Sequence, residues 1–291
     1  MKVLVLGGSG MLGHRLWISL QSRHEVWVSV LGDQSPFPNV PEFPPQRIHL
    51  GVDAESSDQL ARVLNALRPD VVVNCIGVIK QRKEAVDPSL SISLNALFPH
   101  RLASICKLVG SRMIHISTDC VFTGSKGGYR ESDLSDAEDL YGRTKALGEV
   151  HYPHTVTLRT SIIGQELATR FGLIEWFLAQ TGAIHGYQKA IFTGVTTIEL
   201  SRVIRDYVMP NGALSGLYHV SSTPVTKYEL LRMAAAAYGR PIEIEPDASV
   251  VCDRSLDSSR FRQATGYQPP AWPEMLAEMA SQAPFYSQFR G

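Results

Sequence analysis

Short apolar runs alternate with amphipathic segments through the first half of the chain. The runs are bounded mostly by Gly, Pro or Asp and show little internal alternation, which is typical of strands buried on both faces. Strands are predicted at residues 3–6, 25–30, 48–50, 71–76, 113–116 and 156–158, and helices at 11–21, 57–67, 88–109 and 141–150. This alternation predicts an α/β fold, a Rossmann-type doubly wound parallel sheet with helices on both faces.

The pattern changes after about residue 160. Helices are expected at 173–180, 198–207, 227–238 and 275–279, and strands at 217–220 and 242–245. We therefore predict a first unit over residues 1–160 and a smaller mixed α/β unit over 161–291, parts of which return to the first sheet. The segment 32–46 contains prolines at 36, 38, 41, 44 and 45 and cannot hold a regular helix. It is interpreted as a surface loop, with a lid over a bound ligand as the alternative.

Composition and charge narrow the classes of partner. The 28 basic and 28 acidic side chains of the 291 residues cancel, so no broad basic field points to a nucleic acid. Cysteines at 75, 106, 120 and 252 have no C-x-x-C spacing, and no acidic cluster has ligand spacing, so no metal site is predicted. No apolar run approaches the roughly 18 residues of a membrane span, and no secretory signal follows Met1. A cytoplasmic protein without a membrane partner is expected.

A glycine-rich turn joins the first predicted strand to the first helix. Gly7 would allow the tight turn, Gly10 would let the backbone approach a pyrophosphate, and Gly13 would let the helix pack closely on the strand. Backbone N–H groups at Met11 and Leu12 would then meet the phosphates, next to Ser9. The turn predicts a dinucleotide-binding unit.

The choice between NADH and NADPH stays open. Asp33 lies 20 residues after Gly13, near where an acid reads the ribose hydroxyls of NAD, although it could equally be a solvated residue of the proline-rich segment. No basic residue at 30–35 favours a 2′-phosphate. Arg15, on the first helix, could still reach a phosphate.

Tyr141 and Lys145 are four residues apart at the start of a predicted helix, so both lie on one helical face. A nearby lysine favours the phenolate, lowers the tyrosine pKa and can bond the nicotinamide ribose. The pair is common by itself, but here it follows the fifth strand of a glycine-turn domain. That strand ends in Ser117 and Thr118, and either hydroxyl could hold a substrate carbonyl oxygen.

These motifs resemble the extended short-chain dehydrogenase/reductases, and more narrowly the dTDP-4-dehydrorhamnose reductase group. The resemblance rests on the glycine turn, S-T-D-C-V-F-T-G at 117–124 and Y-G-R-T-K at 141–145. It continues in L-N-A-L-F-P at 94–99, R-T-S at 159–161, G-L-Y-H-V at 216–220, L-D-S-S-R at 256–260 and P-A-W at 270–272. It thus spans nearly the whole chain.

The resemblance implies roles for individual residues. The catalytic residues would be Thr118, Tyr141 and Lys145, and the last two would also contact the cofactor. Further cofactor contacts would come from Asp53 at the adenine, Cys75, Ile76 and Gly77 in the cleft, and Thr160 and Ser161 near the nicotinamide. Asp119, Cys120 and Phe122 would face the substrate. Asn95 matches a family asparagine, and a structural hydrogen-bond bridge is its alternative role.

The activity that the resemblance implies is reduction, by NADPH or NADH, of the 4-keto group of a nucleotide-linked 6-deoxysugar. Residues 161–291 would bind the substrate, with Arg254, Arg260 or Arg262 as donors to its diphosphate. The expected assembly is a homodimer.

Two alternatives to a simple reductase stay open. Cys120 replaces the family's usual tyrosine, and the related GDP-fucose synthases carry a cysteine at this spacing, so the chain could also epimerise its substrate. His185 would then be the candidate second acid. The other alternative is a non-catalytic dinucleotide-binding subunit, like the one that regulates a methionine adenosyltransferase.

Overall fold

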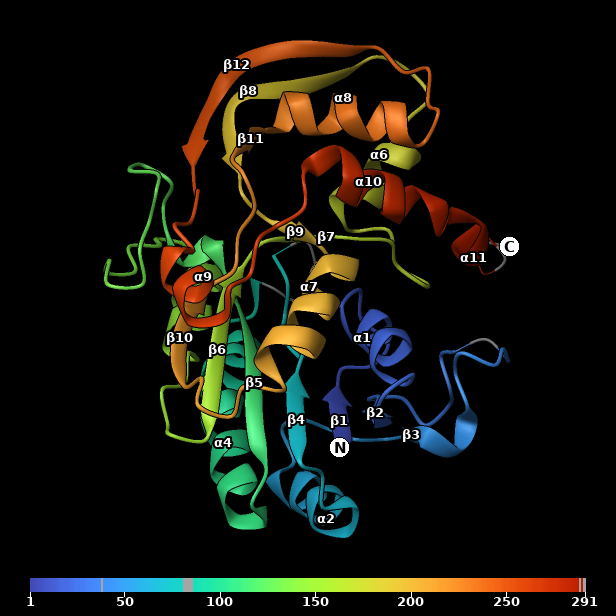
Figure 1. Ribbon diagram of the computed structural model, residues 1–291, viewed down its shortest axis with the longest axis vertical. Helices are drawn as coiled ribbons and strands as arrows, with labels where there is room; N and C mark the ends of the chain where they lie inside the picture. The colour runs from blue at the N-terminus through green and yellow to red at the C-terminus, as the bar shows by residue number, and fades with distance from the viewer. Residues whose placement is uncertain (38, 81–85, 288, 290–291) are drawn as a thin grey trace.

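The computed structural model describes residues 1–37, 39–80, 86–287 and 289. A parallel sheet forms one half of the molecule, and a smaller mixed α/β unit sits over the carboxyl ends of its strands (Figure 1). Pro38 of the predicted loop and Gly291 of the predicted second unit lie outside the described residues. Within the described part of the chain, no helix is both long enough and apolar enough to cross a membrane.

Seven parallel strands form the main sheet, in the order β10-β6-β5-β4-β1-β2-β3. They are β1 (Lys2–Leu6), β2 (Glu25–Ser29), β3 (Ile48–His49), β4 (Val71–Asn74), β5 (Arg112–Thr118), β6 (Thr155–Thr160) and β10 (Gly216–His219). The predicted fold class is confirmed. The chain order reverses between β1 and β4, and ligands of such sheets bind in the crevice at this point.

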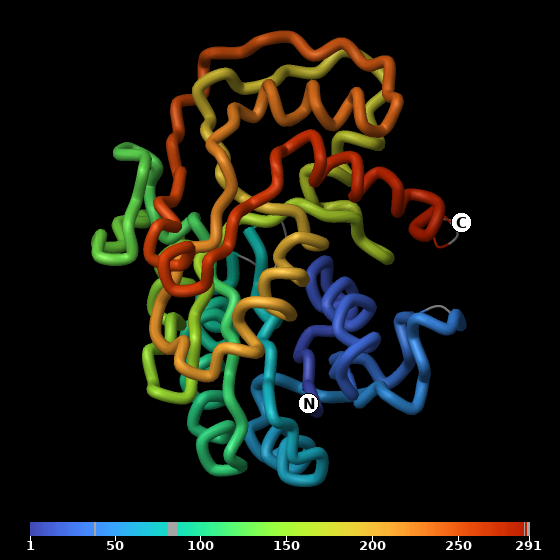
Figure 2. Tube along the Cα trace, viewed as in Figure 1, coloured from blue at the N-terminus to red at the C-terminus, as the bar shows by residue number. Residues whose placement is uncertain are grey.

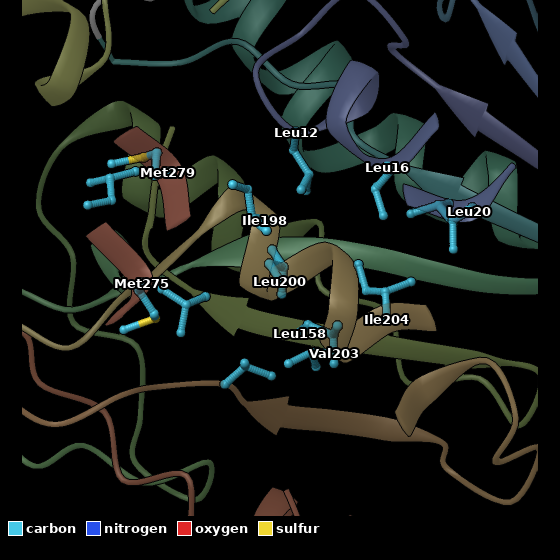
Figure 3. Packing of buried hydrophobic residues seen from close by; sticks show 14 of the residues in the cluster. Leu12, Leu16, Leu20, Leu158, Ile198, Leu200, Val203, Ile204, Met275 and Met279 are labelled. Atoms are coloured by element: carbon cyan, nitrogen blue, oxygen red, sulfur yellow. The ribbon is translucent and has the colours of Figure 1, made fainter. Parts of the chain in front are cut away.

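Two hydrophobic cores lie on opposite faces of the sheet, because successive side chains of a strand point to opposite sides. Leu4 and Leu6 pack in the core that includes α2 (Ser57–Leu67) and α4 (Phe98–Val109). Val3 and Val5 belong to the other core. That core includes α1 (Gly13–Leu20) and α7 (Thr197–Val203), whose apolar side chains face one another in Figure 3.

The single helix predicted at 88–109 is divided by a wider turn. It starts as α3 (Pro88–Ser91), passes through a π-helical stretch at Ile92–Leu97 and continues as α4. Pro99 has no N–H to give to the Asn95 carbonyl, so the regular hydrogen-bond ladder fails there. The N–H of Phe98 bonds instead to the carbonyl of Ser93. The π-helical stretch carries Asn95 toward the cleft side of α5 (Leu140–Leu147), with which it makes contact.

The second unit is built on a three-stranded sheet in the order β11-β8-β12. Its strands and the small β7-β9 pair are β8 (Ile184–Phe192), β11 (Val225–Thr226), β12 (Ile244–Asp253), β7 (Ile162–Ile163) and β9 (Val195–Thr196). Its helices are α6 (Leu173–Leu178), α8 (Lys227–Ala237), α9 (Ser259–Thr265), α10 (Trp272–Ser281) and α11 (Ala283–Ser287). The sequence did not predict β8, whose glycine and exposed polar residues break the apolar pattern. The predicted strand at 242–245 is the beginning of the much longer β12.

The proline-rich segment packs on α1 through two aromatic side chains. Phe37 and Phe43 contact the buried Trp17, with ring centroids 5.0 and 5.2 Å from it. Phe43 also meets Phe285 of α11, which brings the end of the chain beside α1 (Figure 2). These contacts support the interpretation of the segment as a surface loop.

Candidate active site

The glycine turn after β1 combines crowded and open positions. Gly7 has a φ of +79°, and a Cβ on Gly13 would overlap the Gly7 carbonyl oxygen, so both positions require glycine. A Cβ on Gly8, which the sequence-based analysis did not select, would lie 2.6 Å from Val28 Cβ. Ser9 and Gly10 are exposed, and a Cβ on Gly10 would meet only the Gly7 oxygen, at 3.3 Å. The bare backbone at Gly10 suits the close approach of a pyrophosphate.

His14 supports the turn from behind. Its Nδ1 lies 2.8 Å from the Gly10 oxygen, and its Nε2 lies 2.8 Å from the Tyr286 hydroxyl of α11. Burial lowers the pKa of His14 to about 4, so the imidazole is neutral at neutral pH. Nδ1–H therefore donates to Gly10, and Nε2 accepts from Tyr286. The last helix of the chain thus helps to fix the turn.

The segment after β4 connects the turn to the catalytic residues. A Cβ on Gly7 would lie 3.2 Å from Ile76 Cγ1 and 3.3 Å from the Cys75 backbone. A Cβ on Gly77 would lie 3.0 Å from Asn95 Oδ1 and 4.0 Å from Lys145 Nζ. The structure therefore brings these predicted cofactor residues together.

Asn95 acts as a structural bridge. Its Oδ1 accepts from the Val78 N–H at 2.9 Å, and its amide nitrogen donates to the Val78 oxygen at 3.1 Å. The amide also donates to the Thr144 hydroxyl at 3.4 Å. Both ends of this buried amide are thus occupied by the protein itself, as its alternative role predicted.

Asp33 and Asp53 follow β2 and β3. Asp33 is exposed, and its Oδ1 would lie 2.9 Å from a Cβ on Gly51. Asp53 is half-buried and accepts from the Glu55 N–H at 2.9 Å. The N–H of Gly8 in the glycine turn bonds to the Ser29 oxygen of β2 at 2.9 Å, and β3 lies next to β2 in the sheet. Both acids therefore follow strands on the β2 side of the turn. Their contact with a cofactor stays a prediction.

Gly142 places Tyr141 close to the end of β5. A Cβ at residue 142 would overlap the Cys120 carbonyl oxygen, so only glycine lets α5 approach the 3₁₀ turn Asp119–Val121 this closely. The Asp139 carboxylate caps α5 by accepting from the Gly142 N–H at 2.9 Å, and it also pairs with Lys80 at 3.0 Å. The start of α5 is therefore held against the residues that follow Thr118.

Burial, rather than the neighbouring lysine, dominates the titration of Tyr141. Its pKa is raised above the ordinary value, first by burial and then by the negative charge that Cys120 would carry, while hydrogen bonding to Thr118 acts in the opposite direction. The sequence led us to expect a lowered pKa, and that expectation is wrong for this structure. The phenol keeps its proton at neutral pH, as a proton donor must.

Lys145 is buried at the base of the site. Its ammonium donates to the Ile116 oxygen at 2.8 Å, and burial lowers its pKa to about 8, while Glu149 and Cys75 favour the charged form. Part of the cation's hydrogen-bonding capacity is therefore already used by β5.

The hydroxyls of Ser117 and Thr118 have different partners. Ser117 donates to Glu149 at 2.6 Å, and Glu149 is held by two bonds of 2.6 Å from Arg159. Thr118 donates to Asp119 Oδ1 at 3.2 Å, a long bond, and accepts from the Cys120 N–H at 3.1 Å. Ser117 thus belongs to a buried ion pair, and Thr118 is the hydroxyl that neighbours Tyr141.

Among the three predicted substrate residues, Phe122 needs correction. Its ring is fully buried, stacked on Tyr129 with centroids 4.0 Å apart and covered by the Arg159 guanidinium at 5.1 Å. A side chain without exposed surface cannot touch a substrate, so Phe122 is a packing residue. Asp119 is buried beside Thr118, and burial raises its pKa.

Cys120 does not have the properties of a reactive thiolate. Burial and the neighbouring Asp119 raise its pKa to about 12, although the Arg254 Nη1 lies 3.8 Å from its sulfur. His185, the candidate second acid, is an exposed residue of β8 that pairs with Glu245 at 3.6 Å. His185 lies near the start of β8, and Phe192 is the last residue of that strand. Seven residues separate them, which is roughly 23 Å along an extended strand.

The three candidate arginines occupy different places. Arg254 donates to the Phe122 oxygen at 2.8 Å and lies beside Cys120. Arg260 stacks on Tyr218 at 4.7 Å and lines a separate surface pocket. Arg262 Nη2 lies 3.4 Å from the Ser221 oxygen, which accepts its hydrogen bond. Only Arg254 is placed next to the predicted catalytic residues.

Thr160 pairs in register with Thr118 at the carboxyl ends of β6 and β5. Thr160 is buried, and the half-buried Ser161 follows it and accepts from the Val195 N–H at 3.0 Å through its carbonyl. Both therefore lie at the same edge of the sheet as the other candidates. In the described ranges, no group of three or more His, Cys, Asp or Glu side chains is placed to hold a metal ion.

The family is decided by a match over nearly the whole chain. Residues 1–284 match the family model described as the RmlD substrate binding domain. The chain belongs to this family. The predicted resemblance is thereby confirmed at the level of the RmlD family.

The relatives of this RmlD family member include two kinds of protein. The dTDP-4-dehydrorhamnose reductase of Aggregatibacter actinomycetemcomitans is 23% identical over 257 residues, 80% of this chain and 87% of that protein. The methionine adenosyltransferase 2 subunit beta of Bos taurus is 24% identical over 98% of this chain and 91% of that protein.

Solved structures of similar fold include a reductase and an epimerase. The dTDP-4-dehydrorhamnose reductase of Bacillus anthracis in complex with NADP has a TM-score of 0.79 and 20% identity, covering 97% of this chain and 99% of that chain. The UDP-glucose 4-epimerase of Thermotoga maritima with UDP-glucose has a TM-score of 0.80 and 17% identity, covering 98% of this chain and 99% of that chain. At these identities, the likeness shows the fold.

Sequence reasoning missed several residues that shape the site of this RmlD family member. Glu149 and His14 carry no motif, and Arg159 belongs to the R-T-S segment at 159–161 without a role being assigned to it; the roles of all three follow from contacts between distant segments. A local signal existed for Asp139, since an Asp just before a predicted helix is a typical N-cap. A local signal also existed for Gly142, because glycine inside a helix usually marks a close approach.

Proposed function

We propose that the protein is an NAD(P)H-dependent reductase of the 4-keto group of a nucleotide-linked 6-deoxysugar. The main support is the position of Thr118, Tyr141 and Lys145, which lie together at the carboxyl edge of the sheet. The segment that contains Gly77 lies between these residues and the glycine turn. Membership in the RmlD family and relatives named dTDP-4-dehydrorhamnose reductase support the same reaction. Solved neighbours crystallised with NADP or NAD agree with the cofactor predicted from the sequence.

The residues after β1 would hold the cofactor. The exposed backbone at Ser9 and Gly10 leaves room for a pyrophosphate, and the N–H groups at Met11 and Leu12 would face it. Lys145 would bond the nicotinamide ribose with the donors that Ile116 leaves free. Further contacts are proposed for Asp33 and Asp53, for Cys75, Ile76 and Gly77, and for Thr160 and Ser161. The reduced nicotinamide, when bound, would supply a hydride to the carbonyl carbon.

The protein would supply orientation and a proton. Thr118 would hold the carbonyl oxygen by a hydrogen bond, and Tyr141, which keeps its proton at neutral pH, would transfer that proton to the oxygen as charge develops on it. The positive charge of Lys145 would favour the phenolate that remains. Asp119 and Cys120 would form the wall beside the sugar.

The direct test is turnover. The protein would be incubated with NADPH or NADH and a panel of nucleotide-linked 4-keto-6-deoxysugars, and loss of the absorbance of the reduced nicotinamide would be followed. We expect oxidation of the cofactor that requires one of the sugars. Tyr141→Phe should slow it by about 10²- to 10⁴-fold and leave cofactor affinity intact. Absence of turnover across the panel, in a protein that binds NADPH or NADH, would contradict the proposal.

The same test addresses a non-catalytic role. The methionine adenosyltransferase 2 subunit beta of Bos taurus covers 98% of this chain, and the dTDP-4-dehydrorhamnose reductase of Aggregatibacter actinomycetemcomitans covers 80%. Thr118, Tyr141 and Lys145 are all present here, which favours an enzyme. Turnover that depends on Tyr141 would exclude a purely regulatory subunit. A cytoplasmic location and a homodimer stay predictions.

A further inference from the structure

Lys227 is a cation to which the proposed mechanism assigns no role. It is the first residue of α8, is half-buried, and its ammonium lies 4.4 Å from the centre of the Phe192 ring. Within the described residues, no carboxylate lies within 4 Å of this ammonium and no hydrogen bond satisfies it. An acceptor that reaches this half-buried ammonium would gain a charge-assisted hydrogen bond that no described group of the protein supplies.

The surroundings of Lys227 contain a second cation, Arg254, and a buried acid, Asp119. Burial lowers the pKa of Lys227, and the negative forms of Asp119, Cys120 and Cys252 act against that change, whereas the cation of Arg254 adds to it. Arg254 is fixed by the bond from its Nε to the Phe122 oxygen at 2.8 Å. Asp119 acts on both cations, and Asp136 and Asp139 also act on Arg254. Thr226 and Asp253 both pair with Ile191 of β8, so Lys227 and Arg254, which follow them in the chain, lie near one another.

This cluster adjoins the reacting end of the site. Asp119 and Cys120 directly follow Thr118, and both also act on the titration of Tyr141. Lys227 begins α8 and Arg254 directly follows β12, and both elements belong to the second unit. The second unit lies over the carboxyl ends of the main strands (Figure 1). A substrate held at Thr118 and Tyr141 would therefore extend toward two cations.

We infer that Lys227, together with Arg254, binds the diphosphate of the nucleotide-linked substrate. The inference rests on the proposed function, and it selects Arg254 from the three candidate arginines and adds a lysine that no motif marks. The ammonium of Lys227 has no carboxylate partner among the described residues, and Arg254 offers a forked donor beside this point charge. Arg260 and Arg262 are engaged elsewhere, with Tyr218 and with the Ser221 oxygen.

The test measures binding, not turnover. Titration calorimetry would follow dTDP and UDP, and in parallel thymidine and uridine, for the wild type and for Lys227→Met. Methionine keeps an unbranched apolar stem against Phe192 and removes the charge, so the fold should survive, which circular dichroism and thermal unfolding would check. Lys189→Met is the matched control, because Lys189 is an exposed lysine of β8 in the same small sheet.

Lys227→Met should weaken binding of the preferred nucleoside diphosphate roughly 10- to 100-fold and leave binding of the nucleoside alone unchanged. Lys189→Met should bind like the wild type. Equal diphosphate affinity in wild type and Lys227→Met would overturn the inference. So would an equal loss for nucleoside and diphosphate, or an increased KM for the sugar substrate with unchanged diphosphate affinity. A wild-type protein that turns over a sugar of the panel but does not bind its nucleoside diphosphate would overturn this inference alone. One that binds neither diphosphate and turns over none of the sugars would overturn both this inference and the proposed function.

Discussion

Ser117 donates its hydroxyl proton to Glu149, with 2.6 Å between Ser117 Oγ and Glu149 Oε1. Glu149 is at the same time clamped by Arg159, and all three side chains are buried. A hydroxyl held this tightly by a buried carboxylate does not readily give its only proton to a substrate. Thr118 also donates to a buried carboxylate, that of Asp119, but over 3.2 Å, which is long for an O–H donor. Of the two hydroxyls at the end of β5, Thr118 is therefore the one left for chemistry.

This relationship predicts opposite phenotypes for two neighbours. Thr118→Val should lower the rate of ketone reduction at least 10-fold while the thermal unfolding temperature changes little, because its side-chain bonds are long or local. Ser117→Ala should retain most activity but unfold at a lower temperature, since a buried charged acceptor loses a donor, at a cost of about 1–3 kcal/mol. Initial rates and thermal melts of both variants check this. An inactive, fully stable Ser117→Ala would contradict the assignment.

Two glycines of the turn should respond differently to substitution. Gly13→Ala would drive a methyl group into the Gly7 carbonyl oxygen, so the protein should be strongly destabilised. The Cβ of Gly10→Val would meet only that same oxygen, at 3.3 Å, so the protein should fold, but the side chain would occupy the space that a pyrophosphate needs. Circular dichroism and NADH or NADPH titration separate these effects. Unchanged cofactor affinity in Gly10→Val would count against dinucleotide binding at this turn.

Cofactor binding should depend on the charge of Lys145. Burial lowers its pKa from 10.5 to about 8, so the ammonium is present below that pH and is lost as the pH rises through it. NADH or NADPH affinity should therefore fall above about pH 8. The groups that face Lys145 are Glu149 of the same segment, Cys75 after β4 and His115 of β5. Lys145→Met should bind the cofactor weakly at every pH, and a wild-type affinity that stays constant from pH 7 to about 9 would disagree.

The same shift predicts the sign of a stability change. The unfolded chain keeps the Lys145 proton up to about pH 10.5, whereas the folded chain releases it near pH 8. Between these values the unfolded state binds more protons, so the contribution of Lys145 to the free energy of unfolding rises with pH. Comparison of urea unfolding in wild type and Lys145→Met across this range isolates that contribution. A difference between the two proteins that falls with rising pH would show the opposite sign.

Cys120 should not exchange protons with the substrate. A thiol whose pKa is raised to about 12 is almost wholly protonated at neutral pH and is a poor base. Incubation with the 4-keto substrate in D₂O, followed by NMR of the reduced product, should show no enzyme-dependent deuterium at C3 or C5. Deuterium that appears with the wild type and disappears in Cys120→Ser would instead establish an epimerase step.

Features that depend on neighbouring residues could be predicted from the sequence. The apolar runs predicted the parallel sheet because both faces of each strand are buried. The glycines at 7, 10 and 13 marked the turn because a tight strand-to-helix turn that meets a pyrophosphate favours residues without side chains at these positions. Tyr141 and Lys145 could be paired because a helix fixes their spacing. β8 was missed because its stability comes from pairing with β12, more than 50 residues away, and not from its own pattern.

Only the tertiary structure decided how each of these residues is used. Phe122 belongs to the motif at 117–124, yet packing between Tyr129 and Arg159 removes it from the substrate side. The Tyr141 pKa rises instead of falling, because desolvation depends on everything that covers the ring. Lys227 comes beside Asp119 only after α8 is placed over the sheet. The sequence determined which groups are present and their local spacing, whereas burial and long-range contact determined their charge, their partners and their access to a ligand.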